Sequence, residues 1–337
     1  MLYNQLKHLG VPALLAAVAL GCSPSSESPT PKVASAETDT KFVAITQIVE
    51  HPALDSIRDG VKDELAAAGY EEGNNLKWMW ESAQGNPAIA AQIANKFVGE
   101  QPDLIIAIAT PSAQAVVSAT DQIPVLFSGI TDPLGAKLVT DLENPGGLVT
   151  GVSDLSPIAQ HLDLIAEISP NANRIGVLYN AGESNSVSLV SLLKQETSQR
   201  NMTLVEATVA NSGDVATAAR SLVGKVDAVY IPTDNTVGSA VESVVKVGLD
   251  NQLPVFAADT DTVKRGAIAT LSFNYYDVGR QTGQMALRVF GGEKPGNIAV
   301  ESAKKLELSL NLGAAEGMGL TIPDSVISRA DEVFETF

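Results

Sequence analysis

The sequence is poor in cysteine, in aromatic residues and in positive charge. Cys22 is the only cysteine among 337 residues, so no disulfide can form within the chain. Aromatic residues make up 5% of the chain and hydrophobic residues 45%, a composition typical of Val-, Ile- and Ala-rich parallel sheets covered by helices. The formal net charge of −17 repels the phosphates of nucleic acids, so we expect no nucleic-acid partner.

Motifs for catalysis and for metal or nucleotide binding are missing as well. The three histidines, His8, His51 and His161, have no spacing to Cys or Asp that fits a metal site. The chain contains no Gly-x-Ser-x-Gly, no Walker loop and no Gly-x-Gly-x-x-Gly. We therefore expect no enzymatic activity, no metal and no cofactor. Only His51 lies near a strand end, where it could contact a ligand or simply lie at the surface where a helix begins.

The first 21 residues have the layout of a secretory signal. Lys7 precedes an apolar stretch, Val11 to Leu20, which is too short to span a bilayer. Residues 19–22, Ala-Leu-Gly-Cys, resemble a bacterial lipobox, although Leu is more usual than Ala at its first position. We expect cleavage before Cys22 and lipidation of that residue; the alternative is an ordinary signal peptide with a chance cysteine. Residues 22–40, rich in Ser, Pro and Thr, predict a disordered tether.

Residues 227–261 show how the folded part is built. A short apolar strand, Ala228 to Ile231, is followed by polar turn residues and by a helix whose valines recur at helical spacing. A second buried strand, Leu253 to Ala257, comes next. A looser copy of this unit begins at Asp103. Strands and helices that alternate in this way predict an α/β fold with doubly wound parallel sheets.

The pattern restarts after about residue 150, which predicts two similar lobes. We assign residues 41–150 and about 274–300 to an N-terminal lobe, and residues 151–273 and about 301–337 to a C-terminal lobe. The late elements can return to the first lobe, which gives several hinge strands. Because ligands bind at the carboxyl ends of strands in open parallel sheets, the cleft between the lobes is the expected binding site.

The strand ends that face this cleft carry hydroxyl and carboxylate groups. Three hydroxyl residues are expected at helix N-termini: Thr110, Ser112 and Thr233. Free N–H groups and the helix dipole attract a carboxylate there. Three acidic residues can bind an ammonium group: Asp132, Asp234 and Asp259. The combination suits a zwitterion such as an amino acid, and the absence of arginine from these edges argues against a phosphate or a dicarboxylate. The alternative for each residue alone is a simple helix cap.

Aromatic residues lie in or near the predicted strands: Phe127, Tyr179, Tyr230, Phe256 and Tyr275. An aromatic ligand could stack on one or two of them, whereas the alternative places most of them in the core.

Seven stretches resemble the solute-binding lipoproteins of ABC importers, and more narrowly the family that includes the tryptophan/phenylalanine-binding proteins of the TrpX kind. They are ITQIVEHPALD (45–55), DLIIAIATPSAQA (103–115), TDPLGAKLV (131–139), NPGGLVTGVSDLSP (144–157), RIGVLYNAGESNS (174–186), DAVYIPTDNTV (227–237) and KKLELSLNL (304–312). The resemblance extends from about residue 42 to 333. It implies a type I periplasmic-binding fold with three crossovers between the lobes, and an ABC permease with its ATPase subunit as partners.

Carried over by position, the resemblance implies ligand-facing groups on both lobes. They are Gln47, Thr110, Ser112, Thr131, Asp132, Asn180, Asn185, Thr233, Asp234, Asn235 and Asp259. It also implies an aromatic amino acid, such as tryptophan or phenylalanine, as the ligand.

The sequence thus predicts a monomeric, extracytoplasmic receptor that is anchored to a bacterial membrane through Cys22 and captures its ligand by hinge closure. One alternative is a sensor that presents its closed form to a membrane kinase or chemoreceptor, and another is a receptor for a sugar or a nucleoside. A racemase with a similar fold would need an acid–base pair across the cleft, which the sequence does not offer. A DNA-binding regulator would begin with a basic helix-turn-helix.

Overall fold

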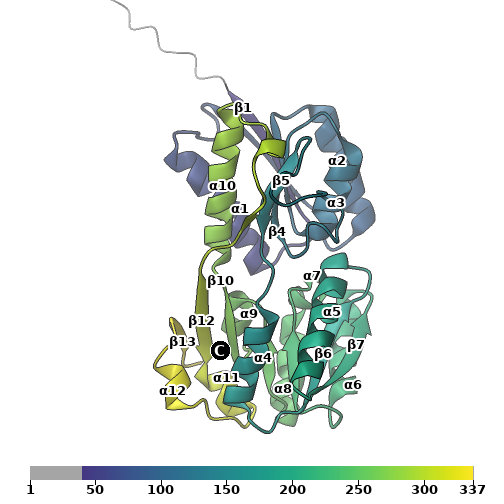
Figure 1. The fold of residues 1–337 in the computed structure, drawn as a ribbon, viewed down its shortest axis with the longest axis vertical. Helices are drawn as coiled ribbons and strands as arrows, with labels where there is room; N and C mark the ends of the chain where they lie inside the picture. Colours follow the sequence, from purple (N-terminus) through teal and green to yellow (C-terminus); the bar gives the residue numbers. More distant parts are fainter. Residues whose placement is uncertain (1–39, 337) are drawn as a thin grey trace, which may run out of the picture. The chain divides into compact units, whose positions relative to one another are not determined.

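The structure is a computed structural model that describes residues 40–336, in which strands and helices alternate along most of the chain (Figure 1). The expected signal peptide, the lipidated Cys22 and nearly all of the expected tether lie outside the described residues. No helix within residues 40–336 has the length and apolar character that crossing a bilayer requires.

The first sheet has six parallel strands in the order β11-β5-β4-β3-β1-β2. These strands are β1 (Lys41–Gln47), β2 (Leu76–Ser82), β3 (Leu104–Ile108), β4 (Val125–Ile130), β5 (Val149–Ser153) and β11 (Glu301–Ser302). Its main helices are α1 (Pro52–Ala67), α2 (Pro87–Glu100), α3 (Thr110–Ala119) and α10 (Tyr275–Phe290). Figure 1 shows α1 and α10 on one side of the sheet and α2 and α3 on the other.

The second part contains two smaller sheets. A parallel sheet has the order β7-β6-β8-β9, with β6 (Arg174–Asn180), β7 (Thr203–Val209), β8 (Ala228–Ile231) and β9 (Val255–Ala257). A three-stranded sheet has the order β10-β12-β13, with β10 (Ala269–Phe273), β12 (Leu306–Asn311) and β13 (Glu332–Phe334). Strands β10 and β12 are antiparallel, so this sheet differs from the parallel sheets that the sequence predicts.

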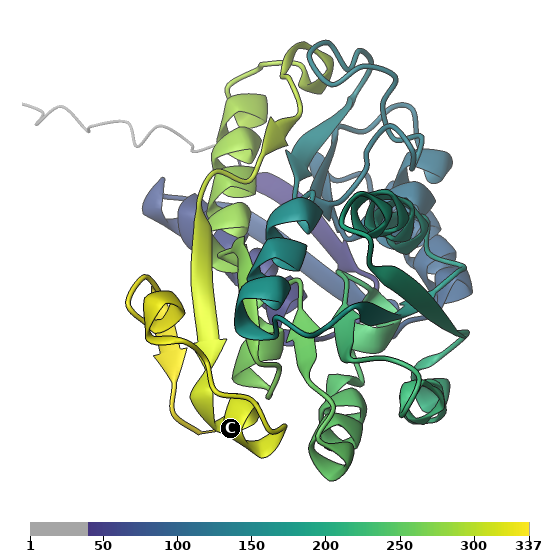
Figure 2. The same ribbon diagram turned by 60° about the horizontal axis from the view of Figure 1, so that its bottom comes forward.

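Helices surround these two sheets. They are α4 (Ile158–Ile168), α5 (Ser184–Gln199), α6 (Val215–Leu222), α7 (Asn235–Gly238), α8 (Val241–Asn251), α9 (Thr260–Lys264), α11 (Leu312–Gly317) and α12 (Asp324–Ile327). Short 3₁₀ turns lie at η1 (Ser212–Asp214) and η2 (Pro295–Asn297). In Figure 2, α4 lies between strands β10 and β12, on one side, and helix α5, on the other.

Each part has its own hydrophobic core. One core is built from the strands and helices of the first sheet, including α10, and the other from elements between Ile158 and Val326. We call the two parts the N lobe and the C lobe. The chain passes between them three times: at 154–157, at Asn274 and at 303–305. The expected boundary after residue 150 falls inside β5, because β5 continues to pair with β4 as far as Ser153.

Two glycines bring α1 and α10 into close contact. A Cβ atom at Gly279 would lie 2.1 Å from the carbonyl oxygen of Ile57, and one at Gly60 would lie 2.2 Å from the carbonyl oxygen of Tyr276. This contact fixes the beginning of α10, which directly follows the crossover at Asn274, against the N lobe.

Candidate ligand-binding cleft

A cavity lies between the lobes, at the carboxyl ends of strands from both. The N lobe contributes Thr110 and Thr131, and the C lobe contributes Asn185, Thr233 and Asp259. Two residues that flank crossovers, Asp154 and Tyr275, complete the wall next to the hinge. Parallel strands direct their carboxyl ends to one edge of each sheet, which explains why residues far apart in the sequence meet here.

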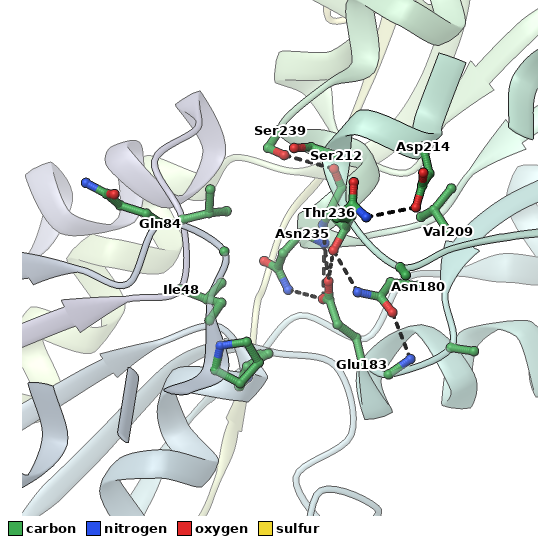
Figure 3. A pocket seen from close by; sticks show the side chains of 18 of the residues that line it. Ile48, Gln84, Asn180, Glu183, Val209, Ser212, Asp214, Asn235, Thr236 and Ser239 are labelled. Carbon is green, nitrogen blue, oxygen red and sulfur yellow. Dashed lines mark hydrogen bonds between the residues drawn. The ribbon is translucent and has the colours of Figure 1, made fainter. Parts of the chain in front are cut away.

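A wider groove of about 1410 Å³ opens between the lobes at a distance from the crossovers (Figure 3). Figure 3 shows Ile48 and Gln84 on one wall, facing Asn180 and Asn235 on the other. Its lining is mostly small or uncharged, and the carboxylate of Glu183 is already engaged by the N–H groups of Asn235 and Thr236. The groove therefore offers little charge to a zwitterion, and the inner cavity is the better candidate for the site.

The N terminus of α3 forms part of the wall of the inner cavity. Ala109 precedes it with φ 70° and ψ 153°, a conformation that residues other than glycine rarely adopt. The side chain of Thr110 is buried, and its Oγ1 has no hydrogen-bond partner within residues 40–336. The hydroxyl of Ser112 is also buried without a partner in this part of the chain, but Ser112 does not line the cavity. Together with the helix dipole, Thr110 makes this part of the wall attractive to an anion.

Acidic side chains line other parts of the cavity wall. Asp259 caps α9 by accepting hydrogen bonds from the backbone N–H and the hydroxyl of Thr262, both at 2.7 Å. Asp154 is buried and accepts a hydrogen bond of 2.9 Å from the Tyr275 hydroxyl. Burial raises the pKa of Asp154 to about 6, and burial likewise raises the pKa of Asp261 to about 6. These parts of the wall therefore favour a cationic group.

Asp234 lines the cavity, but its carboxylate is occupied by the protein. It accepts hydrogen bonds from the N–H groups of Val237 (2.7 Å) and Asn180 (2.6 Å) and from the Ser186 hydroxyl (2.6 Å). Burial, followed by the nearby charge of Glu183, raises its pKa to about 7. Asp234 thus joins β6, α5 and α7 and has little capacity left for a ligand.

The predicted ligand-facing residues as a whole divide into two groups. Those that line the cavity are Thr110, Thr131, Asn185, Thr233, Asp234, Asn235 and Asp259. Those that do not are Gln47, Ser112, Asp132 and Asn180. In the first group, the Asn185 amide donates to the Thr233 carbonyl at 3.0 Å, and its Oδ1 has no partner among the described residues.

Three residues of the second group have protein partners instead. The Gln47 amide donates to Asp55 at 2.8 Å, and its oxygen accepts from the Trp80 indole at 3.2 Å. Asp132 accepts a hydrogen bond from Ser188 of the C lobe. Asn180 lies in the wider groove, where its amide donates to Thr236 at 2.9 Å.

Sequence reasoning missed three charged residues that line the cavity: Asp154, Asp261 and Arg265. Arg265, at the end of the short α9, lines the cavity, so the prediction that arginine is absent from this edge is wrong. Its guanidinium pairs with Glu242 at 2.6 Å and donates to the Gly238 carbonyl at 2.7 Å. His51 also lines the cavity and makes no capping bond to α1; burial lowers its pKa, which favours the neutral imidazole.

Most of the aromatic side chains lie in the cores, which is the alternative to stacking on a ligand. Phe127, Tyr230 and Phe256 are fully buried in the two cores, whereas Tyr275 lines the cavity. No group of three or more His, Cys, Asp or Glu side chains within the described range is arranged to hold a metal ion.

Comparison with known proteins identifies similar sequences over most of the chain. A family model described as ABC transporter substrate binding protein matches residues 42–334. The tyrosine-binding protein of Clostridioides difficile (strain R20291) is 40% identical over 271 residues, which cover 80% of this chain and 79% of that protein.

Solved structures are similar over 88% of this chain and the whole of each matched chain. A conserved domain protein from Vibrio cholerae has a TM-score of 0.86 and 52% identity. An ABC domain from Streptococcus pneumoniae in complex with L-Trp has a TM-score of 0.85 and 35% identity. A ligand-free, open substrate-binding protein from Clostridium difficile has a TM-score of 0.67 and 37% identity.

The last two structures differ little in identity but clearly in TM-score. With equal coverage and nearly equal identity, the higher score of the L-Trp complex indicates that the lobes here are arranged more as in that complex than as in the open protein. The contact of 3.5 Å between the hydroxyls of Thr131 and Thr233, which belong to different lobes, agrees with a closed cleft.

Proposed function

The chain belongs to the ABC transporter substrate-binding protein family, and on that premise we propose that it captures an aromatic amino acid by closure of its two lobes. It has the α/β, type I periplasmic-binding fold that the sequence predicts. The ligand would be delivered to the permease of an ABC importer, whose ATPase subunit drives transport.

One observation carries the amino-acid assignment: the cavity between the lobes is lined both by a helix N terminus and by acidic side chains. Thr110 and the N terminus of α3 offer donors and a positive dipole end to a carboxylate. The acidic groups Asp154 and Asp259 offer acceptors to an ammonium group. A zwitterion satisfies both kinds of group at once, whereas a neutral sugar would leave the acidic side chains without a cation.

The relatives support an aromatic side chain. One is named a tyrosine-binding protein and another was solved with L-Trp. In this chain the small residues Ala53, Gly129 and Gly238 line the cavity together with Tyr275, on which a ring can stack.

The same proposal includes the cellular setting. ABC substrate-binding proteins are extracytoplasmic. We expect lipidation of Cys22 after removal of residues 1–21, a tether formed by residues 22–40, and a monomeric receptor. No bond is made or broken in this function, because the cavity serves to bind and release its ligand.

A thermal-shift screen of the protein against the twenty amino acids, sugars and nucleosides tests the proposal. A ligand that binds only the folded state raises the unfolding midpoint by mass action. We expect a selective rise with tryptophan, tyrosine or phenylalanine. A rise only with a sugar or a nucleoside would keep the receptor and contradict the zwitterion argument, and no rise with any compound would contradict the assignment as a whole.

The alternative of a sensor differs in its partner rather than in its ligand. Genes for a permease and an ATPase next to the gene for this chain would favour import, whereas a neighbouring membrane kinase or chemoreceptor gene would favour sensing.

A further inference from the structure

Asp154 is a buried carboxylate at the hinge of the molecule. It is 3% exposed and is the first residue after β5, where the chain leaves the N lobe. The Tyr275 hydroxyl, from the first residue of α10 after the second crossover, donates to its Oδ2 at 2.9 Å. Thr131 Oγ1 lies at 3.5 Å from its Oδ1, too far for a strong bond. One carboxylate oxygen of Asp154 is therefore weakly satisfied.

The charged groups that face Asp154 do not compensate it. The cavity also contains Asp234, Asp259 and Asp261, and the charge of Asp259 disfavours ionisation of Asp154. Its two basic groups are His51, whose pKa burial lowers, and Arg265, which is paired with Glu242. No ion pair with Asp154 is formed by any Lys, Arg or His in the described part of the chain. A buried carboxylate without a cation is unfavourable, because burial removes the water that would otherwise solvate its charge.

Space for a cation exists beside this carboxylate. Asp154 lines the cavity, and its Oδ1, which has only the distant Thr131 hydroxyl as a partner, can accept a further hydrogen bond there. Two further polar atoms in the same cavity, Thr110 Oγ1 and Asn185 Oδ1, are buried and have no partner within residues 40–336. Because buried polar atoms are usually hydrogen-bonded, these two atoms favour a polar ligand in the cavity.

We propose that Asp154, oriented by Tyr275, binds the primary ammonium group of the amino-acid ligand. The proposal rests on the function proposed above and replaces Asp132 and Asp234 as candidates for this role, since both have protein donors. It places the cationic end of the ligand between two crossovers, so that the contact joins residues of the hinge itself. Binding and closure are then coupled at one carboxylate.

A double-mutant cycle between protein and ligand tests this contact. Titration calorimetry compares L-tyrosine with 3-(4-hydroxyphenyl)propionate, and L-tryptophan with indole-3-propionate, the second compound of each pair lacking the ammonium group. We expect the wild-type protein to prefer the amino acid by about 100-fold or more, as for a desolvated charge pair. In Asp154→Asn the preference should fall to within about threefold, because the amide retains the size of the side chain but not its charge.

Three variants separate this role from its rivals. Asp259→Asn should lower the preference for the amino acid less than Asp154→Asn does, because the Asp259 carboxylate already accepts two hydrogen bonds from Thr262. Asp121→Asn, at an exposed loop position, is the control and should leave the preference unchanged. Tyr275→Phe should reduce the preference partly, because it removes the hydroxyl that orients Asp154. Loss of the preference in Asp259→Asn but not in Asp154→Asn would overturn the proposal.

The pH dependence of binding gives a second readout. Because burial raises the pKa of Asp154 to about 6, the affinity of the wild-type protein for the amino acid should fall below about pH 6, by up to about tenfold per pH unit. Affinity for the deaminated analogue should not show this fall, and Asp154→Asn should show a flatter profile. Without ligand, Asp154→Asn should be at least as stable as the wild type.

The outcomes distinguish the two levels of the proposal. If the wild-type protein binds none of the amino acids, the proposed function and the role of Asp154 both fail. If it binds them and Asp154→Asn retains the preference for the ammonium group, only the role of Asp154 fails. If Asp154→Asn unfolds easily and loses affinity for amino acid and analogue equally, Asp154 is a structural residue and the proposal is overturned.

Discussion

The hydroxyl of Ser188 donates a hydrogen bond of 2.9 Å to the carboxylate of Asp132. Ser188 belongs to α5 in the C lobe and Asp132 follows β4 in the N lobe, so this bond joins the lobes directly. One helical turn earlier on α5, the Gln114 amide of the N lobe donates to the Ser184 hydroxyl at 3.3 Å. Residues four apart share one face of a helix, and this face of α5 therefore meets the N lobe in the closed arrangement.

Ser188→Ala should lower ligand affinity although Ser188 does not line the inner cavity. The substitution removes an interlobe bond to a charged group, which shifts the equilibrium towards the open form and should weaken binding by about three- to thirtyfold. Stopped-flow measurement should place most of the change in the dissociation rate. Ser191→Ala, at an exposed position of the same helix, is the matched control. Equal affinities of the two variants would show that the contact does not contribute to closure.

Asp234→Ala should destabilise the C lobe. The carboxylate accepts three hydrogen bonds, from Val237, Asn180 and Ser186, and its loss leaves buried donors without partners. We expect the free energy of unfolding to fall by about 2–4 kcal/mol in denaturant titrations. The control Asp250→Ala, which removes an exposed ion pair with Lys246, should change stability by less than about 0.5 kcal/mol. A stable Asp234→Ala variant that binds amino acids weakly would instead restore Asp234 as an ammonium ligand.

The strands were accessible to sequence reasoning because they are continuous apolar runs between turn residues. Strand β8 has the predicted bounds, Ala228 to Ile231, and β9 begins two residues after the predicted start at Leu253. Thr110 could be assigned to the site because a strand followed by a helix places that residue at the sheet edge, whichever side chains surround it.

Residues whose surroundings come from distant parts of the chain could not be assigned in this way. Gln47 meets Trp80, 33 residues away, and Asp132 meets Ser188, 56 residues away, and both are thereby occupied. Asp154 lies on a crossover, where no periodic pattern tells which side chain points inward. Its role depends on Tyr275, which lies 121 residues later.

The buried His161 should make stability fall as the pH falls from about 6.5 to 4. Its Nε2–H donates to the Leu271 carbonyl and its Nδ1 accepts from the Tyr230 hydroxyl, both at 2.7 Å, and burial lowers its pKa to about 4. In this window the unfolded chain takes up a proton that the folded chain does not, so the unfolded state gains stability. The loss reaches about 3 kcal/mol and is complete below about pH 4.

The contribution of His161 can be isolated from opposing ones. The raised pKa values of Asp154 and Asp234 add stability as the pH falls towards 3.8. The dependence of wild-type stability on pH is therefore the sum of these contributions and the opposing one from His161. The difference in unfolding free energy between the wild type and His161→Phe should therefore be followed from pH 7 to 4. Tyr230→Phe, which loses a bond to the ring but keeps the imidazole, should retain the slope. A difference that does not change with pH would contradict the neutral, buried state of His161.

Two glycine-to-alanine substitutions should have opposite effects on stability. At Gly279 the new Cβ would lie 2.1 Å from the Ile57 carbonyl oxygen, so α10 must move away from α1, and we expect a loss of at least about 2 kcal/mol. At Gly99, in α2, no heavy atom lies within 4 Å of the added Cβ, and higher helix propensity should add up to about 1 kcal/mol. Because α10 begins at Tyr275, Gly279→Ala should also weaken ligand binding, whereas Gly99→Ala should not. Denaturant titration and calorimetry of both variants check this, and a Gly279→Ala protein with wild-type stability would show that the helix contact is looser than the structure indicates.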